Sequence, residues 1–237
     1  MTILRKYIKF FLVAVLIGFA VLIAYYLIRS AFRPARYLRV MEWFRNPEAH
    51  TDWVIPAKTK CGDAPFIFPT EGYAGFIWDD SFRPGHRHAG IDIFSGKEPG
   101  DTPIYAAYDG YLTRRSDWKS SVIIRIPSDP LNPGTQIWNY YTHMADKDGY
   151  SFIVEKFPPG TEDLFVPAGT LLGYQGNYSG DTRNPTGVHL HFSVVKDDGS
   201  GTYLNELQIK NTLDPSDYFN LALNAKENRD QIPRCSE

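Results

Sequence analysis

This chain contains Gly85-His86-Arg87-His88-Ala89-Gly90-Ile91-Asp92-Ile93 and, far downstream, Gly187-Val188-His189-Leu190-His191-Phe192. Four of its six histidines lie in these two stretches, and a fifth, His143, lies between them. Imidazole and carboxylate groups are ligands that zinc favours, and a catalytic zinc typically takes three protein ligands and keeps one position open for water. Two histidines and one aspartate can fill such a site, which leaves two histidines for proton transfer.

The spacing within the downstream stretch predicts a strand. Side chains two residues apart on a strand lie on the same face, so His189 and His191 point to one side. Leu190 and Phe192 then point to the opposite side, where a hydrophobic core would bury them. The pattern therefore indicates a strand with chemistry on one face and packing on the other.

The upstream pair has a different spacing. His88 and Asp92 are four residues apart, which would align them on a helix. Gly90 and the β-rich sequence after it argue against a helix. We expect a bend at Gly90 that leads into a strand, with the fold bringing both side chains together.

The sequence after Cys61 consists of short β segments separated by turn residues. The expected strands are residues 90–94, 104–114, 121–126, 136–143, 170–174 and 189–195. Only residues 215–225 suggest a terminal helix, and aromatic residues make up 15% of the chain. Together with many glycines and prolines, this composition predicts a mainly β fold built on an antiparallel sheet.

The order of the histidine motifs resembles that of the lysostaphin/LytM-like zinc endopeptidases, which cut peptide cross-links in bacterial cell walls. The matching elements are H-x-x-x-D (His88, Asp92), Tyr-x-His (Tyr141, His143) and H-x-H (His189, His191). The resemblance covers about residues 66–219. It implies a duplicated-hybrid-motif fold, a Zn²⁺ cofactor and hydrolysis of peptidoglycan stem peptides or cross-links.

The resemblance assigns His88, Asp92 and His191 to the metal, and His143 and His189 to catalysis. This division makes chemical sense because no H-E-x-x-H motif is present to supply a glutamate base. Histidine can move protons near neutral pH, while zinc activates water and polarises the scissile carbonyl. Which of His143 and His189 is the general base stays open.

Two segments depart from the family pattern. Residues 145–162 and 128–135 are longer than expected, and such loops wall the substrate groove in this family. The bond that is cut therefore stays open. His86 and His50 match no motif position, and no tyrosine is assigned to the stabilisation of the oxyanion.

Residues 10–28 form an apolar run without a charged residue, between Lys9 and Arg29. At about 1.5 Å per residue the run nearly spans a hydrocarbon core of about 30 Å. It predicts a transmembrane helix that binds the lipid bilayer. The alternative, a cleaved signal peptide, would be followed by a small-x-small cleavage site, and residues 28–33 offer no convincing one.

The chain then divides into five parts. They are a short cytoplasmic N-terminus (1–9), the transmembrane helix (10–28), a juxtamembrane basic and aromatic segment (29–60), the zinc peptidase domain (61–222) and a C-terminal tail (223–237). Within 29–60, residues 29–50 are expected to form a juxtamembrane helix or arm at the headgroup level, or else a solvated linker.

The expected topology is a single membrane pass with the catalytic domain outside the cytoplasm. The positive-inside rule opposes it, since three basic residues precede the span and five follow it closely. The rule is weakest for large domains, and the expected substrate lies outside the cytoplasm. No basic block marks the globular part, and the net charge is −2, so nucleic acid is not an expected partner. The oligomeric state stays open.

Cys61 and Cys235 are the only cysteines, and they bracket the expected domain. They either form a disulfide that ties the C-terminal tail to the start of the domain, or they are two unrelated buried thiols. Two other functions compete with peptidase activity. One is a cell-wall-binding or hydrolase-regulating protein on the same fold, and the other is a phosphate-carrying protein of sugar transport with a related β fold.

Overall fold

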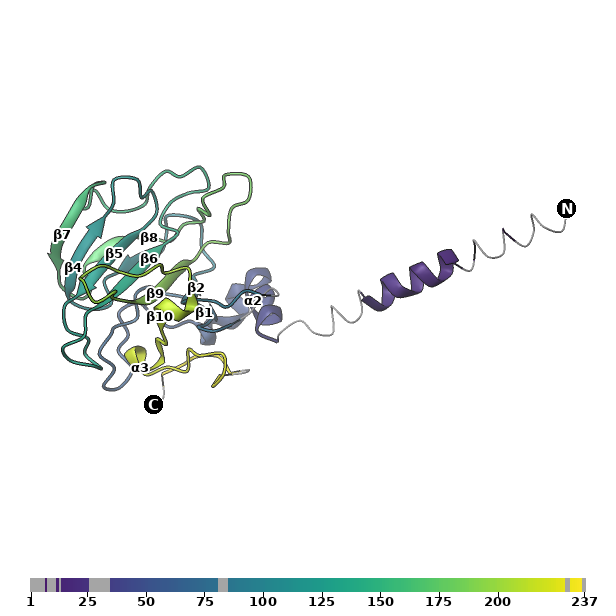
Figure 1. Ribbon diagram of the computed structural model, residues 1–237, viewed down its shortest axis with the longest axis horizontal. Helices are drawn as coiled ribbons and strands as arrows, with labels where there is room; N and C mark the ends of the chain where they lie inside the picture. Colours follow the sequence, from purple (N-terminus) through teal and green to yellow (C-terminus); the bar gives the residue numbers. More distant parts are fainter. Residues whose placement is uncertain are drawn as a thin grey trace.

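An antiparallel sheet forms the centre of the computed structural model, which describes residues 7, 12, 14–25, 35–80, 85–228 and 231–235 (Figure 1). Within those residues the sheet has eight strands in the order β1-β2-β9-β6-β5-β4-β7, with β10 paired to β9. The strands are β1 (Tyr73–Phe76), β2 (Ile91–Phe94), β4 (Gly110–Arg114), β5 (Val122–Ile126), β6 (Ile137–Thr142), β7 (Thr161–Val166), β9 (Leu190–Lys196) and β10 (Thr212–Leu213). The predicted mainly β, antiparallel architecture is confirmed.

The smaller elements flank this sheet. Strands β3 (Pro103–Tyr105) and β8 (Leu171–Tyr174) form a separate two-stranded sheet. The helices are α2 (Ala35–Arg45), η1 (Pro47–Trp53), η2 (Ile209–Asn211) and α3 (Ser216–Phe219).

The predicted strands match most of those observed. Strands β1, β7 and β10 were not predicted, and one predicted strand covers two observed ones. The range 104–114 contains β3 and β4, which belong to different sheets. β7 was not expected because its residues Glu162 to Phe165 are exposed at the sheet edge and show no buried face. The predicted helix at 215–225 is wrong in extent, since α3 ends at Phe219 and Asn220 adopts a left-handed φ of 50°.

Strand β9 has the two-faced character that its sequence predicts. Leu190, Phe192 and Val194 are at most 1% exposed and belong to the main hydrophobic core. The ring of Phe192 lies 5.4 Å from that of Phe219 in α3. Burial of side chains of this size contributes about 1.5–3 kcal/mol each, so the core face of β9 fixes the register of the opposite, histidine-bearing face.

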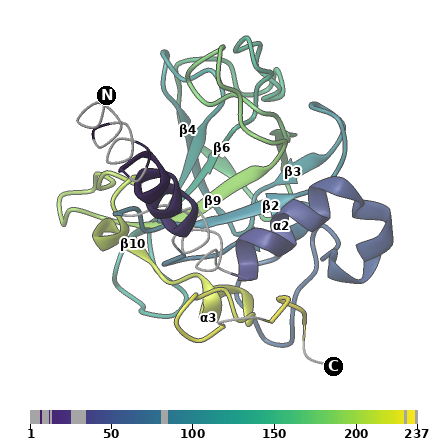
Figure 2. The same ribbon diagram turned by 90° about the vertical axis from the view of Figure 1, so that its right-hand side faces the viewer.

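A second hydrophobic cluster joins α2 and η1 to β1 and β2, at one end of the sheet (Figures 1 and 2). It contains Val40 and Trp43 from α2, Trp53 from η1, Tyr73 from β1 and Phe94 from β2. Most of the segment expected to be a juxtamembrane arm or linker is therefore packed against β1 and β2.

The predicted transmembrane segment is described only in part. Residues 14–25 are helical, and apart from residue 12 the rest of 10–28 lies outside the described residues. Among the residues that the structure describes, no helix combines the length and the apolar character that a membrane crossing requires.

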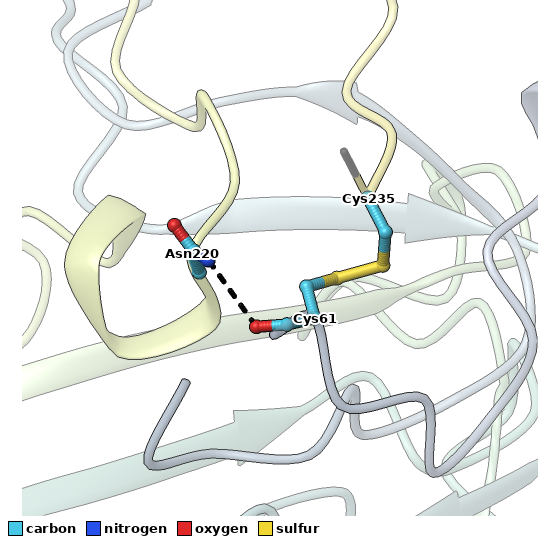
Figure 3. Close-up of a disulfide and its surroundings, with 3 residues drawn as sticks. All are labelled: Cys61, Asn220 and Cys235. Atoms are coloured by element: carbon cyan, nitrogen blue, oxygen red, sulfur yellow. Dashed lines mark hydrogen bonds between the residues drawn. A yellow bond between two sulfur atoms is a disulfide. The ribbon is translucent and has the colours of Figure 1, made fainter. Parts of the chain in front are cut away.

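The disulfide between Cys61 and Cys235 is present, with Cα atoms 5.1 Å apart (Figure 3). The Asn220 side-chain amide donates a hydrogen bond of 3.3 Å to the Cys61 carbonyl, which ties the turn after α3 to the same point. The C-terminal tail is thereby joined to the start of the β domain.

We expect removal of this disulfide to destabilise the domain strongly. It closes a loop across a separation of 174 residues, for which the chain-entropy model gives about 5 kcal/mol. Urea unfolding of the Cys61→Ala/Cys235→Ala variant measures the loss. Reductant should destabilise the wild type and leave the variant unchanged; equal stability of the oxidised wild type and the variant would contradict the prediction.

Candidate metal centre

Two adjacent strands and the loop before one of them carry the central residues of the site. Asp92 lies on β2 and His191 on β9, and the two residues are direct partners across this antiparallel pair. Direct partners in such a pair have side chains on the same face, about 4.5–5.5 Å apart at Cβ. The strand pairing therefore places the Asp92 carboxylate beside the His191 imidazole.

His88 reaches the same point from the loop before β2. Its backbone N–H donates to the Asp80 carbonyl at 2.8 Å, and its carbonyl accepts from the Asp79 N–H at 2.9 Å. The chain then bends at Gly90, where a Cβ atom would lie 2.2 Å from the Phe192 carbonyl oxygen. The expected bend is confirmed, since the backbone bends at residues 89 and 90 and enters β2 at Ile91. The short distance to Phe192 means that only glycine fits at this position.

The three predicted ligands meet at one point. His88 Nε2 lies 3.1 Å from both Asp92 Oδ1 and His191 Nδ1, and His191 Nδ1 lies 2.8 Å from Asp92 Oδ1. Each residue offers one ligand atom, and these three atoms lie within 4.8 Å of one another. His88 and Asp92 are buried and His191 is partly exposed, so the group opens to solvent on one side.

Hydrogen bonds outside this group fix the orientation of both ligand imidazoles. His88 Nδ1 lies 3.1 Å from the Ile77 carbonyl. A carbonyl only accepts, so Nδ1 carries a proton, and in the neutral ring that a metal requires the Nε2 lone pair would point inward. His191 Nε2 bonds to Ser193 Oγ at 2.9 Å, which leaves Nδ1 for the centre.

His143 and His189 follow the same arrangement. His143 Nδ1 donates to the Tyr178 carbonyl at 2.6 Å, and His189 Nδ1 donates to the Gly187 carbonyl at 2.7 Å. The Nε2 atoms are therefore the ring nitrogens left for other partners, and His189 Nε2 lies 3.6 Å from Asp92 Oδ1. The two rings are 4.4 Å apart, so all five predicted residues form one cluster.

His143 occupies a strained position directly after the end of β6. Its φ is 71°, in the left-handed region that non-glycine residues seldom adopt. Such strain is typical of functional sites, where the surrounding structure holds a residue in one conformation. Burial and the neighbouring His189 imidazole lower the pKa of His143 to about 3, so this ring is neutral at physiological pH.

The donor set fits a metal cation. Two nitrogen lone pairs 3.1 Å apart, those of His88 and His191, repel unless a proton or a cation lies between them. Burial would raise the pKa of Asp92, but the positive charge of His88 and His189 when they are protonated, and hydrogen bonds from His191 and His88, hold the pKa well below its ordinary value. A charged carboxylate among inward nitrogen lone pairs matches the N/O ligands of zinc.

The histidines without a predicted role lie outside this group. The ring of His86 is 6.5 Å from that of His88, and His50 of η1 stacks on Trp53 with the ring centres 3.9 Å apart. Tyr73 is fully buried beside Trp43. Ser193 was not predicted from the sequence. It lies two residues after His191, so on a strand its side chain is on the same face as the two histidines.

We expect Ser193→Ala to weaken zinc binding without abolishing it. Ser193 is fully buried and its Oγ lies 2.9 Å from His191 Nε2, and loss of such an outer partner typically costs about 10–100-fold in metal affinity. Competition with a chromogenic chelator measures the dissociation constant. Ser121→Ala is the matched control, since this buried serine bonds to Thr142 and Tyr140. An unchanged dissociation constant in Ser193→Ala would refute the role.

No family model and no curated protein matches the sequence. Among solved structures, the chain is similar to a Pseudomonas aeruginosa protein described as an M23 peptidase, with 21% identity over 74% of this chain and 59% of that one and a TM-score of 0.37. It is also similar to lysostaphin from Staphylococcus simulans, with 16% identity over 70% of this chain and 55% of that one and a TM-score of 0.38.

A third similar structure is a mutant of the catalytic domain of the prophage-encoded M23 protein EnpA from Enterococcus faecalis. Its identity is 22% over 64% of this chain and 96% of that one, with a TM-score of 0.37. The chain spans little more than half the length of the Pseudomonas protein and of lysostaphin. These structures are M23 peptidases, the group to which the motifs show a resemblance.

Proposed function

We propose that this chain is a membrane-anchored zinc metalloendopeptidase that hydrolyses stem peptides or cross-links of bacterial peptidoglycan. The observation that supports it most is the convergence of five side chains on one partly open point. Three of them offer ligand atoms within 4.8 Å of one another. The other two, His143 and His189, donate their Nδ1 protons to backbone carbonyls, which leaves the Nε2 atoms for proton transfer.

In this proposal His88, Asp92 and His191 hold the zinc, which when bound supplies Lewis-acid activation of water and of the scissile carbonyl. His143 and His189 move the protons. The Nε2 atom of one accepts a proton from the attacking water, and the other supports the developing oxyanion or protonates the leaving amine. Because both Nδ1 atoms donate to fixed carbonyls, neither ring has to change tautomer before it accepts a proton.

The two competing functions fit the site less well. A phosphate-carrying histidine needs no adjacent carboxylate and no ligand triad, whereas Asp92 lies within 3.6 Å of three imidazole nitrogens. A binding or regulatory protein on this fold would be expected to lose ligands or catalytic histidines, and all five are present. Turnover is the property that separates these functions.

Digestion of purified peptidoglycan by the full chain tests the proposal. We expect zinc-loaded protein to release peptides that mass spectrometry assigns to one bond type, a chelator to stop the release and added zinc to restore it. A zinc-loaded, folded protein that sediments with the cell wall but releases no peptide would favour the binding function and overturn the peptidase.

The proposed location is the cell membrane, with residues 10–28 as a single span and the catalytic domain outside the cytoplasm. It is supported by the uncharged apolar run and by the substrate class. Protease treatment of intact spheroplasts is the test, with one external and one cytoplasmic protein as references. Survival of the catalytic domain while the external reference is digested would reverse the topology.

A further inference from the structure

We propose that helix α2 holds the catalytic geometry in place, with Phe44 as a positioning residue for His189. The inference rests on the proposed peptidase function, because it concerns a histidine that we assign to proton transfer. Helix α2 lies beside β1 and β2, and β2 carries Asp92 (Figure 2). It precedes the segment to which the sequence motifs show a family resemblance.

Phe44 touches both groups that fix the His189 ring. Its own ring packs edge-on against Phe94 at 5.0 Å, and the Phe94 ring lies 5.0 Å from that of His189. A Cβ atom at Gly187 would lie 2.7 Å from the Phe44 ring, so the ring covers the backbone of Gly187 directly. The Gly187 carbonyl is the acceptor that sets the tautomer of His189.

The opposite end of α2 supports the loop that carries His88. Arg36 is 3% exposed and forms an ion pair of 3.3 Å with Asp80. The Asp80 carbonyl accepts the hydrogen bond from the His88 backbone N–H. One helix therefore contacts the supports of a metal ligand at its start and of a proton-transfer residue at its end.

Buried contacts keep α2 in this position. Val40 is fully buried, and a Cβ atom at Gly75 of β1 would lie 2.9 Å from it. Trp43 is 1% exposed and packs against Trp53 and Tyr73. Phe44 differs from these residues because it is 42% exposed. Its truncation should cost little folding stability, which allows a positioning role to be measured separately from a structural one.

The experiment compares Phe44→Ala and Phe44→Leu with Leu38→Ala in the full-length, zinc-loaded protein. Leu38 is 53% exposed on the same helix and serves as the matched control. For Phe44→Ala we expect kcat to fall about 10- to 100-fold, since a misplacement of about 1 Å can cost as much as about 100-fold. The Michaelis constant, the zinc dissociation constant and the melting temperature should stay at wild-type values, and Phe44→Leu should restore part of kcat. Leu38→Ala should behave as wild type.

Ring-nitrogen NMR signals of His189 give a readout that does not depend on turnover. The wild type should show a single tautomer protonated at Nδ1, and Phe44→Ala should show a mixture of tautomers. If the wild type cleaves no peptide while these signals change as expected, the peptidase function fails and the positioning role stands. Wild-type His189 signals in Phe44→Ala, or an equal loss of kcat in Leu38→Ala, would overturn the positioning role.

Discussion

Alanine in place of His191 is expected to reduce bound zinc from one ion per chain to nearly none and to abolish peptide hydrolysis. His191 is one of three mutually close ligand residues, with Nδ1 3.1 Å from His88 Nε2 and 2.8 Å from Asp92 Oδ1. Its loss leaves two protein ligands, fewer than the three that catalytic zinc sites typically use. Metal analysis after gel filtration measures the stoichiometry, and Asp92→Ala should give the same result.

The matched control is His86→Ala. His86 belongs to the same histidine-rich stretch, yet its ring is 6.5 Å from that of His88 and it is not part of the ligand group. This variant should keep its zinc and its activity. Near-full zinc in His191→Ala or Asp92→Ala would remove the metal assignment.

The sequence predicts the site well where one strand carries the information. The alternation along 189–192 places both histidines on one face, and the packing of the opposite face of β9 in the core confirms it. The approach of His88 and Asp92 to His191 depends on the pairing of two strands about a hundred residues apart. The spacing of hydrophobic residues within one strand cannot predict that pairing. That part of the prediction came from the family resemblance in motif order.

Features that depend on contacts with residues distant in the sequence were predicted poorly. The residues of α2 suggest a basic and aromatic arm, because the burial of Val40 and Trp43 exists only once β1 and η1 are in place. The groups that fix the tautomers of His88, His143 and His189 are backbone carbonyls, which have no side-chain signature. The polar edge strand β7 was missed for a related reason, since exposure removes the alternation that identifies a strand.

Variants of His143 and His189 are expected to keep the metal and lose turnover. Neither residue is in the ligand group, and each donates its Nδ1 proton to a backbone carbonyl, which leaves Nε2 as the nitrogen for proton transfer. Loss of general acid–base assistance typically costs about 10²–10⁴-fold in rate. Zinc stoichiometry and kcat, measured on the same preparations of His143→Ala and His189→Ala, give the two quantities.

The backbone at His143 requires one further variant. Its φ of 71° is costly for alanine, so a loss of activity in His143→Ala combines strain with the missing imidazole. Asparagine accepts the left-handed region more readily, and His143→Asn should therefore fold as the wild type does and remain inactive. If the two histidines act in one proton-transfer sequence, the double variant should lose little more than the slower single variant, since residues that act as a unit are not additive. Wild-type rates in both single variants would show that the proton acceptor lies elsewhere, even if the zinc assignment stands.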